Sequence, residues 1–226
     1  MSAPAAPTAS SRLGGWRGAL PQDGLGTGAR IGSLVADAEA AAERGWSVVP
    51  LHAVSGGRCS CASPTCRAPG GHPRLAWRAS TQQRATPLQI GRWWRCWPAS
   101  NLGVVTGQVS QLIVLDIDPG RGGDESLAKL VAMHGRLPVT PRSLTGAGSW
   151  HLYLRHPARF VPTRPVGPGI DVKADGGLVV APPSRHVSGR RYGWVLGCTP
   201  DEIAPAELPG WLAAMILDQP GSTLGS

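Results

Sequence analysis

The sequence predicts an α+β fold. Short apolar runs separated by turn residues predict strands, and helical patterns occur among them without the regular alternation of a doubly wound sheet. The 226 residues are 42% apolar, which allows a sizeable core, while 31 glycines and 22 prolines predict many loops. Three regions are expected, namely a disordered leader over residues 1–30, a main domain over 31–198, and a C-terminal helix and tail over 199–226.

Periodicity and turn residues place the expected elements along the chain. In chain order they are a helix over 33–44, a strand over 46–51, a helix beginning near Thr86 and Pro87, strands within 101–107 and 111–118, a helix over 124–135, a strand within 149–156, two strands within 170–184, and a helix over 211–217. Gly45 marks the end of the first helix, and Pro87 suits the first turn of the second. The last two strands are expected to be joined through Gly176 and Gly177.

Charge and cysteine content limit the class of protein. The 22 basic and 14 acidic residues give a net charge of +8, which favours polyanions, nucleic acid first, although a merely basic soluble protein fits as well. No apolar run approaches the roughly 20 residues needed to cross a bilayer, so no membrane association is expected. The N-terminus lacks the pattern of a signal peptide. Five cysteines, three of them crowded together, indicate a reduced compartment, and we expect a cytoplasmic protein.

The stretch "RCSCASPTCRAPGGHP" lies in a loop over residues 55–74 that is rich in cysteine, glycine and proline. Its thiols and imidazole form a plausible tetrahedral set for structural Zn²⁺: Cys59, Cys61, Cys66 and His72. Unliganded thiols are the competing interpretation. Cys96 and Cys198 lie apart from this set and are expected to be apolar fillers.

The stretch "QLIVLDIDPG" carries two aspartates at the end of an apolar strand. Asp116 and Asp118 are expected on the same face of that strand, with Cα atoms about 6.6 Å apart. This arrangement suits a hard cation such as Mg²⁺. Alternatively, the aspartates simply open the turn formed by the prolines and glycines of residues 119–123.

Two later stretches also carry polar residues on predicted strands. In "TGAGSWHLYLRHP", alternation puts Ser149, His151 and Tyr153 on one face, after a glycine-rich turn whose backbone N–H groups are suited to phosphate. His151 can equally be an ordinary satisfied polar residue. In "GIDVKADGG", Asp171 lies within an apolar strand, where it requires a partner or a metal ion, and Asp175 is better explained as a turn residue.

A basic loop follows the third stretch. It carries four basic or titratable residues near two prolines, namely Arg185, His186, Arg190 and Arg191. These side chains are able to neutralise phosphates, although a solvated loop is the default interpretation.

Taken in order, these motifs resemble the bifunctional DNA primase/polymerase N-terminal (prim-pol) domain of the archaeo-eukaryotic primase superfamily. The family has a D-x-D or D-x-E pair at a strand end, then s-x-H on a strand, then a single acidic residue. Here these are Asp116 with Asp118, Ser149 with His151, and Asp171. The resemblance covers about residues 35–196, and "NLGVVTG" and "GGLVVAPPSRHVSGRRYGW" also look like the family. One departure is visible in the cysteine-rich loop, where Gly71 stands in place of a frequent lysine.

The resemblance implies an RRM-like catalytic core with a small zinc-binding loop. It makes Asp116, Asp118 and Asp171 the ligands of catalytic Mg²⁺ or Mn²⁺ in a nucleotidyl transferase. One ion would lower the pKa of the attacking 3′-hydroxyl, while the other would bridge the triphosphate and stabilise the leaving pyrophosphate. His151 would contact the phosphates of the incoming nucleotide, with Ser149 beside it.

The implied substrates are a single-stranded DNA template and dNTPs or NTPs. Many relatives continue into a helicase, so a separate helicase is an expected partner if the protein primes in the cell. Two other functions fit the same residues: a non-catalytic module that binds single-stranded nucleic acid, and a metal-dependent nuclease. Carboxylates alone do not separate transfer to a hydroxyl from transfer to water.

Overall fold

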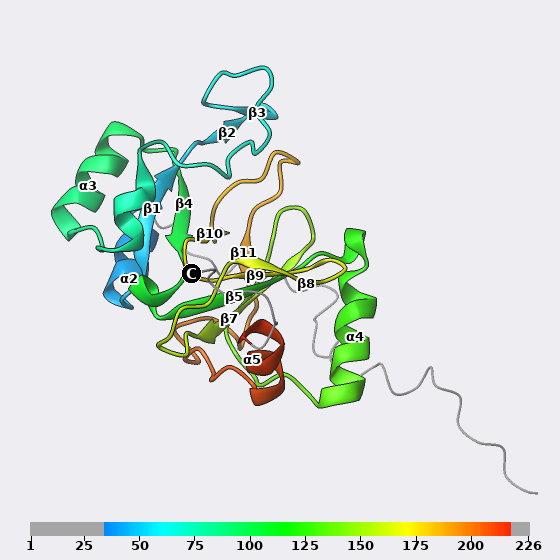
Figure 1. Cartoon of the computed structure of the whole chain (residues 1–226). Coiled ribbons are helices and arrows are strands. Elements are labelled where there is room, and N and C mark those ends of the chain that lie inside the picture. The colour runs from blue at the N-terminus through cyan, green and yellow to red at the C-terminus, as the bar shows by residue number, and fades with distance from the viewer. Residues whose placement is uncertain (1–33, 218–226) are drawn as a thin grey trace, which may run out of the picture.

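Two antiparallel sheets form the framework of the protein. The computed structural model describes residues 34–217. Within them, a three-stranded sheet has the order β1-β4-β10 and a six-stranded sheet has the order β11-β6-β7-β5-β9-β8. A short hairpin, β2-β3, projects from the first sheet (Figure 1). The mixed helices and antiparallel sheets confirm the predicted α+β class.

The helices and strands follow the predicted order, with several short additions. The helices are α2 (Leu34–Glu43), α3 (Pro87–Cys96), α4 (Gly123–His134) and α5 (Gly210–Leu217), with 3₁₀ turns η2 (Trp77–Thr81), η3 (Gln108–Ser110) and η4 (Pro119–Arg121). The strands are β1 (Ser47–Leu51), β2 (Val54–Ser55), β3 (Arg58–Cys59), β4 (Asn101–Val105), β5 (Leu112–Ile117), β6 (Arg142–Leu144), β7 (Trp150–Arg155), β8 (Arg164–Gly167), β9 (Ile170–Lys173), β10 (Leu178–Ala181) and β11 (Gly193–Trp194).

Local chemistry explains where the second helix begins. Thr86 is the N-cap of α3, and its hydroxyl accepts a hydrogen bond from the backbone N–H of Gln89. The side chain of Gln89 accepts one from the backbone N–H of Thr86 in return, which completes a capping box. Pro87 occupies the first turn, where no backbone donor is needed. The predicted start of this helix is confirmed.

Strand β5 is the centre of the structure because it packs on both faces. Ile113, Leu115 and Ile117 point to a core that also includes side chains of α4 and α5. Leu112 and Val114 point the other way, to a core shared with α2, α3 and the three-stranded sheet. Burial on both faces explains why this strand reads as a continuous apolar run.

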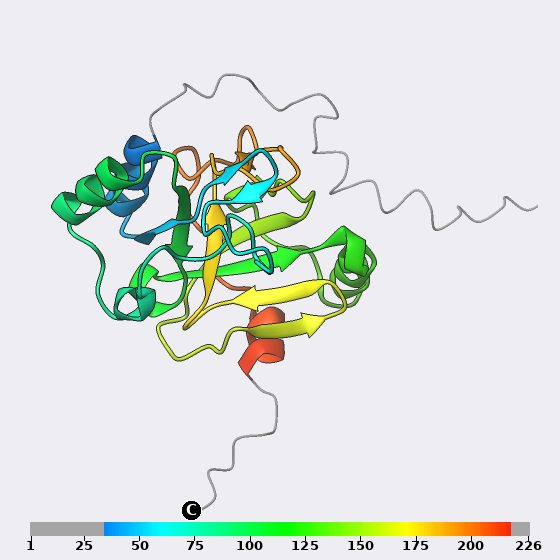
Figure 2. The same ribbon diagram turned by 90° about the horizontal axis from the view of Figure 1, so that it is seen from above.

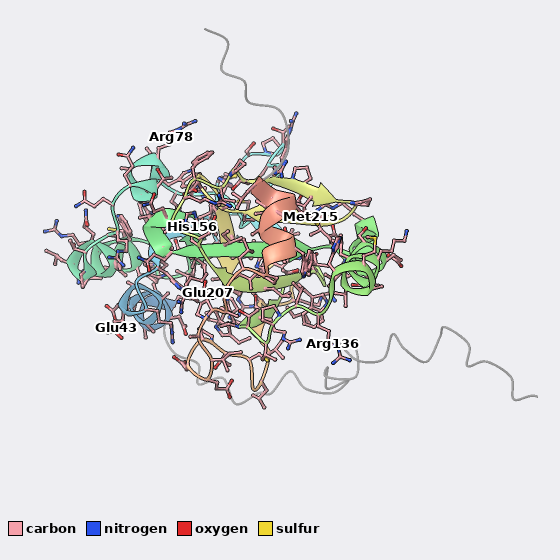
Figure 3. The ribbon with its side chains drawn as sticks, turned by 60° about the horizontal axis from the view of Figure 1, so that its bottom comes forward. Glu43, Arg78, Arg136, His156, Glu207 and Met215 are labelled. Carbon is pink, nitrogen blue, oxygen red and sulfur yellow. The ribbon has the colours of Figure 1, made fainter. Side chains whose placement is uncertain are left out.

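The helices surround the six-stranded sheet from different directions. Figure 2 shows α2 and α3 at one end of this sheet and α4 at the other. Helix α5, which carries the labelled Met215, covers one face of the sheet (Figure 3). Its Leu212 and Ile216 belong to the core. The Arg164 guanidinium donates to the backbone carbonyls of Met215 and Ile216, which fixes the C-terminal end of α5. Helix α5 does not cover the opposite face of the six-stranded sheet, which carries polar side chains.

The link through Gly176 and Gly177 joins two strands, as predicted. The two strands it joins belong to different sheets, since β9 pairs with β5 and β10 pairs with β4. Gly177 passes close to β4: its carbonyl accepts from the Thr106 N–H, and a Cβ on it would lie 2.5 Å from the Thr106 hydroxyl. The connection therefore carries the chain from one sheet to the other rather than closing a hairpin.

Some predicted regions lie wholly or partly outside the described residues. The leader over 1–30 falls outside them, and so does the end of the tail beyond residue 217. The expected C-terminal helix is present as α5.

A tight backbone contact fixes the segment after β5 against the β8–β9 turn. Gly169 has a φ of +66°, and a Cβ on it would lie 2.4 Å from the backbone nitrogen of Gly123. The Asp118 N–H donates to the Gly169 carbonyl over 2.7 Å. The position of Asp118 therefore depends on the absence of a side chain at residue 169.

We expect Gly169→Ala to lower the free energy of unfolding by about 2 kcal/mol or more, since left-handed strain alone costs about 1–3 kcal/mol and the backbone clash adds to it. Urea unfolding followed by circular dichroism measures this. Gly167→Ala in the same hairpin is the control, because its Cβ would meet no atom within 4 Å. Equal stability of the two variants would contradict the role given to Gly169.

Candidate functional site

The candidate site lies on the face of the six-stranded sheet opposite α5. Strand register places Asp116 of β5 directly between His151 of β7 and Asp171 of β9. Facing residues of antiparallel strands project to the same side of the sheet. Three of the predicted site residues, from stretches far apart in the sequence, therefore meet on one surface.

Asp118 joins this group from a turn rather than from the strand. Strand β5 ends at Ile117, and Asp118 is the N-cap of η4, where its Oδ1 accepts from the Gly120 N–H. The prediction that both aspartates lie within one strand is therefore wrong for Asp118. The turn interpretation describes its backbone, while its second carboxylate oxygen, Oδ2, accepts from Arg121.

Two basic side chains compensate the three carboxylates. The guanidinium of Arg121 donates from Nε to Asp118 Oδ2 over 2.8 Å and from Nη2 to Asp171 Oδ2 over 3.0 Å. The Lys173 ammonium lies 3.5 Å from the same Asp171 oxygen. Sequence reasoning missed both residues. Arg121 follows Asp118 by three positions and Lys173 follows Asp171 by two on the same strand face, so their spacing was a usable signal.

The carboxylates differ in their electrostatics. Burial raises the pKa of Asp116; the Lys173 ammonium opposes this, and the neighbouring Asp171 carboxylate adds to it. Burial also acts on Asp171, but the hydrogen bond from Arg121 and the charge of Lys173 hold the pKa of that carboxyl below its usual value. Asp116 is thus the carboxylate with the least compensation, and a bound cation would benefit it most.

His151 is buried beside Asp116. Burial, with a contribution from the Lys173 charge, lowers the pKa of His151 to about 4, so the ring is neutral at pH 7. Its Nε2 lies 3.7 Å from Asp116 Oδ1, which is too long for a hydrogen bond and, with a neutral ring, is not an ion pair. Among the described residues, no group hydrogen-bonds its buried Nδ1. The unused hydrogen-bonding capacity of Nδ1 therefore lies inside the protein, while Nε2 is the nitrogen that faces Asp116.

Aromatic rings surround His151; Tyr153 was expected on its strand face, whereas Tyr192 was not predicted. Tyr192 and Tyr153 each lie 6.3 Å from the His151 ring, centroid to centroid. Burial and the Asp116 charge raise the pKa of Tyr192 to about 12. Trp194 packs against Tyr153 at 4.9 Å. Tyr192 reaches the site from a distant loop, and no local pattern predicts that approach.

In the glycine-rich turn before Ser149, two backbone N–H groups are already bonded within the turn. The Gly148 N–H donates to the Thr145 carbonyl, and the Ser149 N–H donates to the Thr145 hydroxyl. These bonds close the turn on itself. Ser149 itself is buried next to the start of β7.

The basic loop is held close to this turn. The Ser188 hydroxyl donates to the Gly146 carbonyl, and a Cβ on Gly146 would lie 2.1 Å from that of His186. The His186 ring lies 6.3 Å from the Tyr192 ring. The His186 ring of the basic loop thus adjoins Tyr192, which in turn adjoins His151.

Asn101, a buried residue of β4, ties the basic loop to the cysteine-rich loop. Its amide donates to the carbonyls of Gly70 and Arg185, and its oxygen accepts from the Arg185 N–H. The two loops thus share one anchor on the three-stranded sheet.

The cysteine-rich loop gathers its predicted ligands. Cys59, Cys61, Cys66 and His72 have ligand atoms that all lie within 4.8 Å of one another. His72 Nε2 is 3.3 Å from Cys59 Sγ and 3.5 Å from Cys66 Sγ. Within residues 34–217 this is the one set of three or more such side chains gathered this closely. The loop is therefore able to hold a metal ion.

The thiols of this loop differ in acidity. Burial opposes ionisation of Cys59, but hydrogen bonds from the backbone of Cys61 and Gly70 and from His72 bring its pKa down to about 6. Desolvation and the neighbouring thiols raise the pKa of Cys66. Ionising one thiol makes the next harder to ionise, because the thiolates repel each other. A bound dication would neutralise this repulsion.

Two predictions about residues outside these groups need correction. Cys96 is exposed, so it is not a core filler. Asp175 is more than a turn residue: it accepts from the backbone N–H groups of Gln108 and Val161 and from the buried His156 ring over 3.0 Å. Its carboxylate ties together the ends of three segments.

The comparisons agree with this arrangement of motifs. No helix of the described part of the chain has both the length and the apolar character that a membrane span requires. A search of curated proteins finds no match. The family model described as "Bifunctional DNA primase/polymerase, N-terminal" matches residues 38–211, which include both sheets, the acidic group and the cysteine-rich loop. The chain therefore belongs to the bifunctional DNA primase/polymerase N-terminal (Prim-Pol) family.

Proposed function

We propose that this protein is a DNA primase/polymerase that transfers nucleotides from dNTPs or NTPs onto a chain paired with a single-stranded DNA template. One observation carries the proposal: Asp116 faces both His151 and Asp171 across adjacent strands, with Asp118 beside them. This register supports a shared polar surface for the two-aspartate motif, the s-x-H motif and the single acidic residue. Family membership supports DNA and nucleotides as the substrates.

The acidic group suits catalytic Mg²⁺ or Mn²⁺. Its donors are carboxylate oxygens, which both ions prefer, and two of its aspartates already share one cation, the Arg121 guanidinium. We therefore assign Asp116, Asp118 and Asp171 as the metal ligands. When bound, the ions would activate the attacking 3′-hydroxyl and neutralise the triphosphate.

The remaining site residues would position the nucleotide. His151 is neutral at pH 7, and its Nε2 faces the acidic group 3.7 Å from Asp116 Oδ1, so this nitrogen is suited to donate to a phosphate oxygen. Ser149 lies on the same side at the start of β7. The chain supplies no covalent intermediate in this scheme, because orientation and charge neutralisation provide most of the catalysis in phosphoryl transfer.

The basic loop would bind the template or nucleotide phosphates. The loop carries Arg185, Arg190 and Arg191, and it contacts the turn before Ser149 at Gly146 and the site ring Tyr192 through His186. Together with a net charge of +8, they would make binding salt-dependent and largely indifferent to sequence.

We also propose an RRM-like core for the catalytic domain. The strand order β6-β7-β5-β9, with α4 between β5 and β6 in the chain, supports the RRM-like description of the core. We retain residues 31–198 as the catalytic domain and the cytoplasm as its location.

We propose structural Zn²⁺ for the cysteine-rich loop. In a tetrahedral site with ordinary bond lengths, zinc-bound sulfur and nitrogen atoms lie about 3.6 Å apart. The separations from His72 Nε2 to Cys59 and Cys66 are 3.3 and 3.5 Å. A loop of this composition gains much of its order from such an ion.

The first test is primer extension on a single-stranded template with Mg²⁺ or Mn²⁺. We expect Asp116→Asn and Asp171→Asn each to reduce extension by at least about 100-fold, since the metal ions contribute several kcal/mol of charge stabilisation in the transition state. Glu125→Gln is the matched control, because it neutralises an exposed carboxylate on α4 in the same way. Products are resolved on a denaturing gel.

The outcomes separate the proposal from its alternatives. Extension that survives in both aspartate variants would contradict the assigned site. Template binding without extension under either metal ion would favour a non-catalytic binding module. Shortening of the primer, lost in the same variants, would favour a nuclease.

The second test concerns zinc. We expect about one Zn²⁺ per chain in the purified protein and its loss in the Cys59→Ser/Cys66→Ser double variant, because zinc requires its thiolates. Cys96→Ser, at an exposed thiol outside the loop, should keep the ion. Elemental analysis measures the metal, and trypsin should cleave faster after the exposed Arg58 and Arg67 once zinc is lost. Full zinc content in the double variant would rule out this ligand set.

A further inference from the structure

Arg121 has a position that the proposed reaction does not explain. It belongs neither to the metal ligands nor to the nucleotide-binding pair, yet its guanidinium bridges two of the three proposed ligands, Asp118 and Asp171. The three aspartates are not gathered within the 4.8 Å that the zinc ligands reach. The space between two of them holds a side-chain cation.

The bridge is suited to opening. The Arg121 side chain is 55% exposed, and its ion pairs are therefore of the weak, solvent-screened kind. Its backbone is fixed independently, because the Arg121 N–H donates to the Asp118 carbonyl as part of η4. The guanidinium is therefore free to rotate into solvent without disturbing the turn. Lys173, by contrast, is only 26% exposed, and its ion pair is with Asp171.

We propose that Arg121 is a built-in counter-ion, which holds Asp118 and Asp171 when no metal ion is bound and releases them when a divalent cation enters. The inference rests on the proposed function, since it takes these aspartates as metal ligands. The cost of separating Arg121 from both carboxylates then reduces the apparent affinity for metal. Arg121 is a positioning residue in this account, because it acts through the ligands and not on the substrate.

A purely structural ion pair would behave differently. If Arg121 held the aspartates in the arrangement that metal requires, its loss would disorder the ligands and weaken metal binding. If Arg121 competes with the metal ion, its loss leaves the carboxylates uncompensated and strengthens metal binding. The direction of the change in affinity therefore distinguishes the two roles.

The test is a Mn²⁺ titration of the full chain, loaded with zinc, in buffer without chelators. Mn²⁺ prefers oxygen ligands and so avoids the thiolate loop. Isothermal titration calorimetry, or the electron paramagnetic resonance signal of free Mn²⁺, gives the dissociation constant. We expect Arg121→Gln to bind Mn²⁺ roughly 3- to 10-fold more tightly, because metal binding to the parent must first break two solvent-exposed ion pairs that the variant lacks.

Two further variants sharpen the result. Arg121→Lys keeps the charge but not the two-pronged bridge, and we expect an intermediate affinity. Arg95→Gln removes an exposed arginine of α3, away from the acidic group, and should leave the affinity within about twofold of the parent, as distant surface charges are screened. Without Mn²⁺, Arg121→Gln should also unfold at a lower temperature than the parent and gain more from added Mn²⁺.

Asp116→Asn separates failure of this inference from failure of the proposed function. If Mn²⁺ binding is lost in Asp116→Asn but is unchanged or weaker in Arg121→Gln, the counter-ion role is overturned and the metal site stands. If the parent protein shows no Mn²⁺ binding that depends on Asp116, the metal site and the counter-ion role both fall.

Discussion

The register of β5 with its two neighbours is the constraint on which the site depends. Asp116 faces His151 on one side and Asp171 on the other, and a shift of one residue in either pairing would turn these partners to the opposite face. The register is secured by burial, because Ile113, Leu115 and Ile117 fill the core beneath α4 and α5. The apolar side of β5 thus fixes the position of its one carboxylate.

The same strand explains the unequal electrostatics of the acidic group. Asp116 lies within the sheet, where burial disfavours its charge, whereas Asp118 lies in an exposed turn and Asp171 is compensated by Arg121 and Lys173. A cation held by these residues would stabilise the charged form of Asp116, the carboxylate with the least compensation from basic side chains. The polar face is therefore arranged around a positive charge, which Arg121 partly supplies in the structure described here.

Much of this arrangement could be predicted from the sequence because it depends on local signals. Alternation along β5, β7 and β9 placed the polar residues on definite strand faces, and Thr86 with Pro87 fixed the start of α3. The cysteine-rich loop was predictable because its ligands lie close together in the chain. These features need no knowledge of distant contacts.

The remainder depended on contacts between segments that are far apart in the chain. Asp118 is held in place by Gly169, some fifty positions later, whose carbonyl accepts its N–H. Asp175 was taken for a turn residue because its partners, among them His156, lie outside its own stretch. Tyr192 approaches His151 through the packing of the basic loop, which no periodicity encodes.

The most direct test of the central claim is a crystal structure with Mn²⁺ and a non-hydrolysable dNTP analogue. The account predicts an anomalous Mn²⁺ peak coordinated by Asp116 and Asp171, with the triphosphate reaching His151 and the Arg121 guanidinium turned away from both aspartates. A nucleotide bound elsewhere, or Mn²⁺ bound only outside the acidic group, would contradict it.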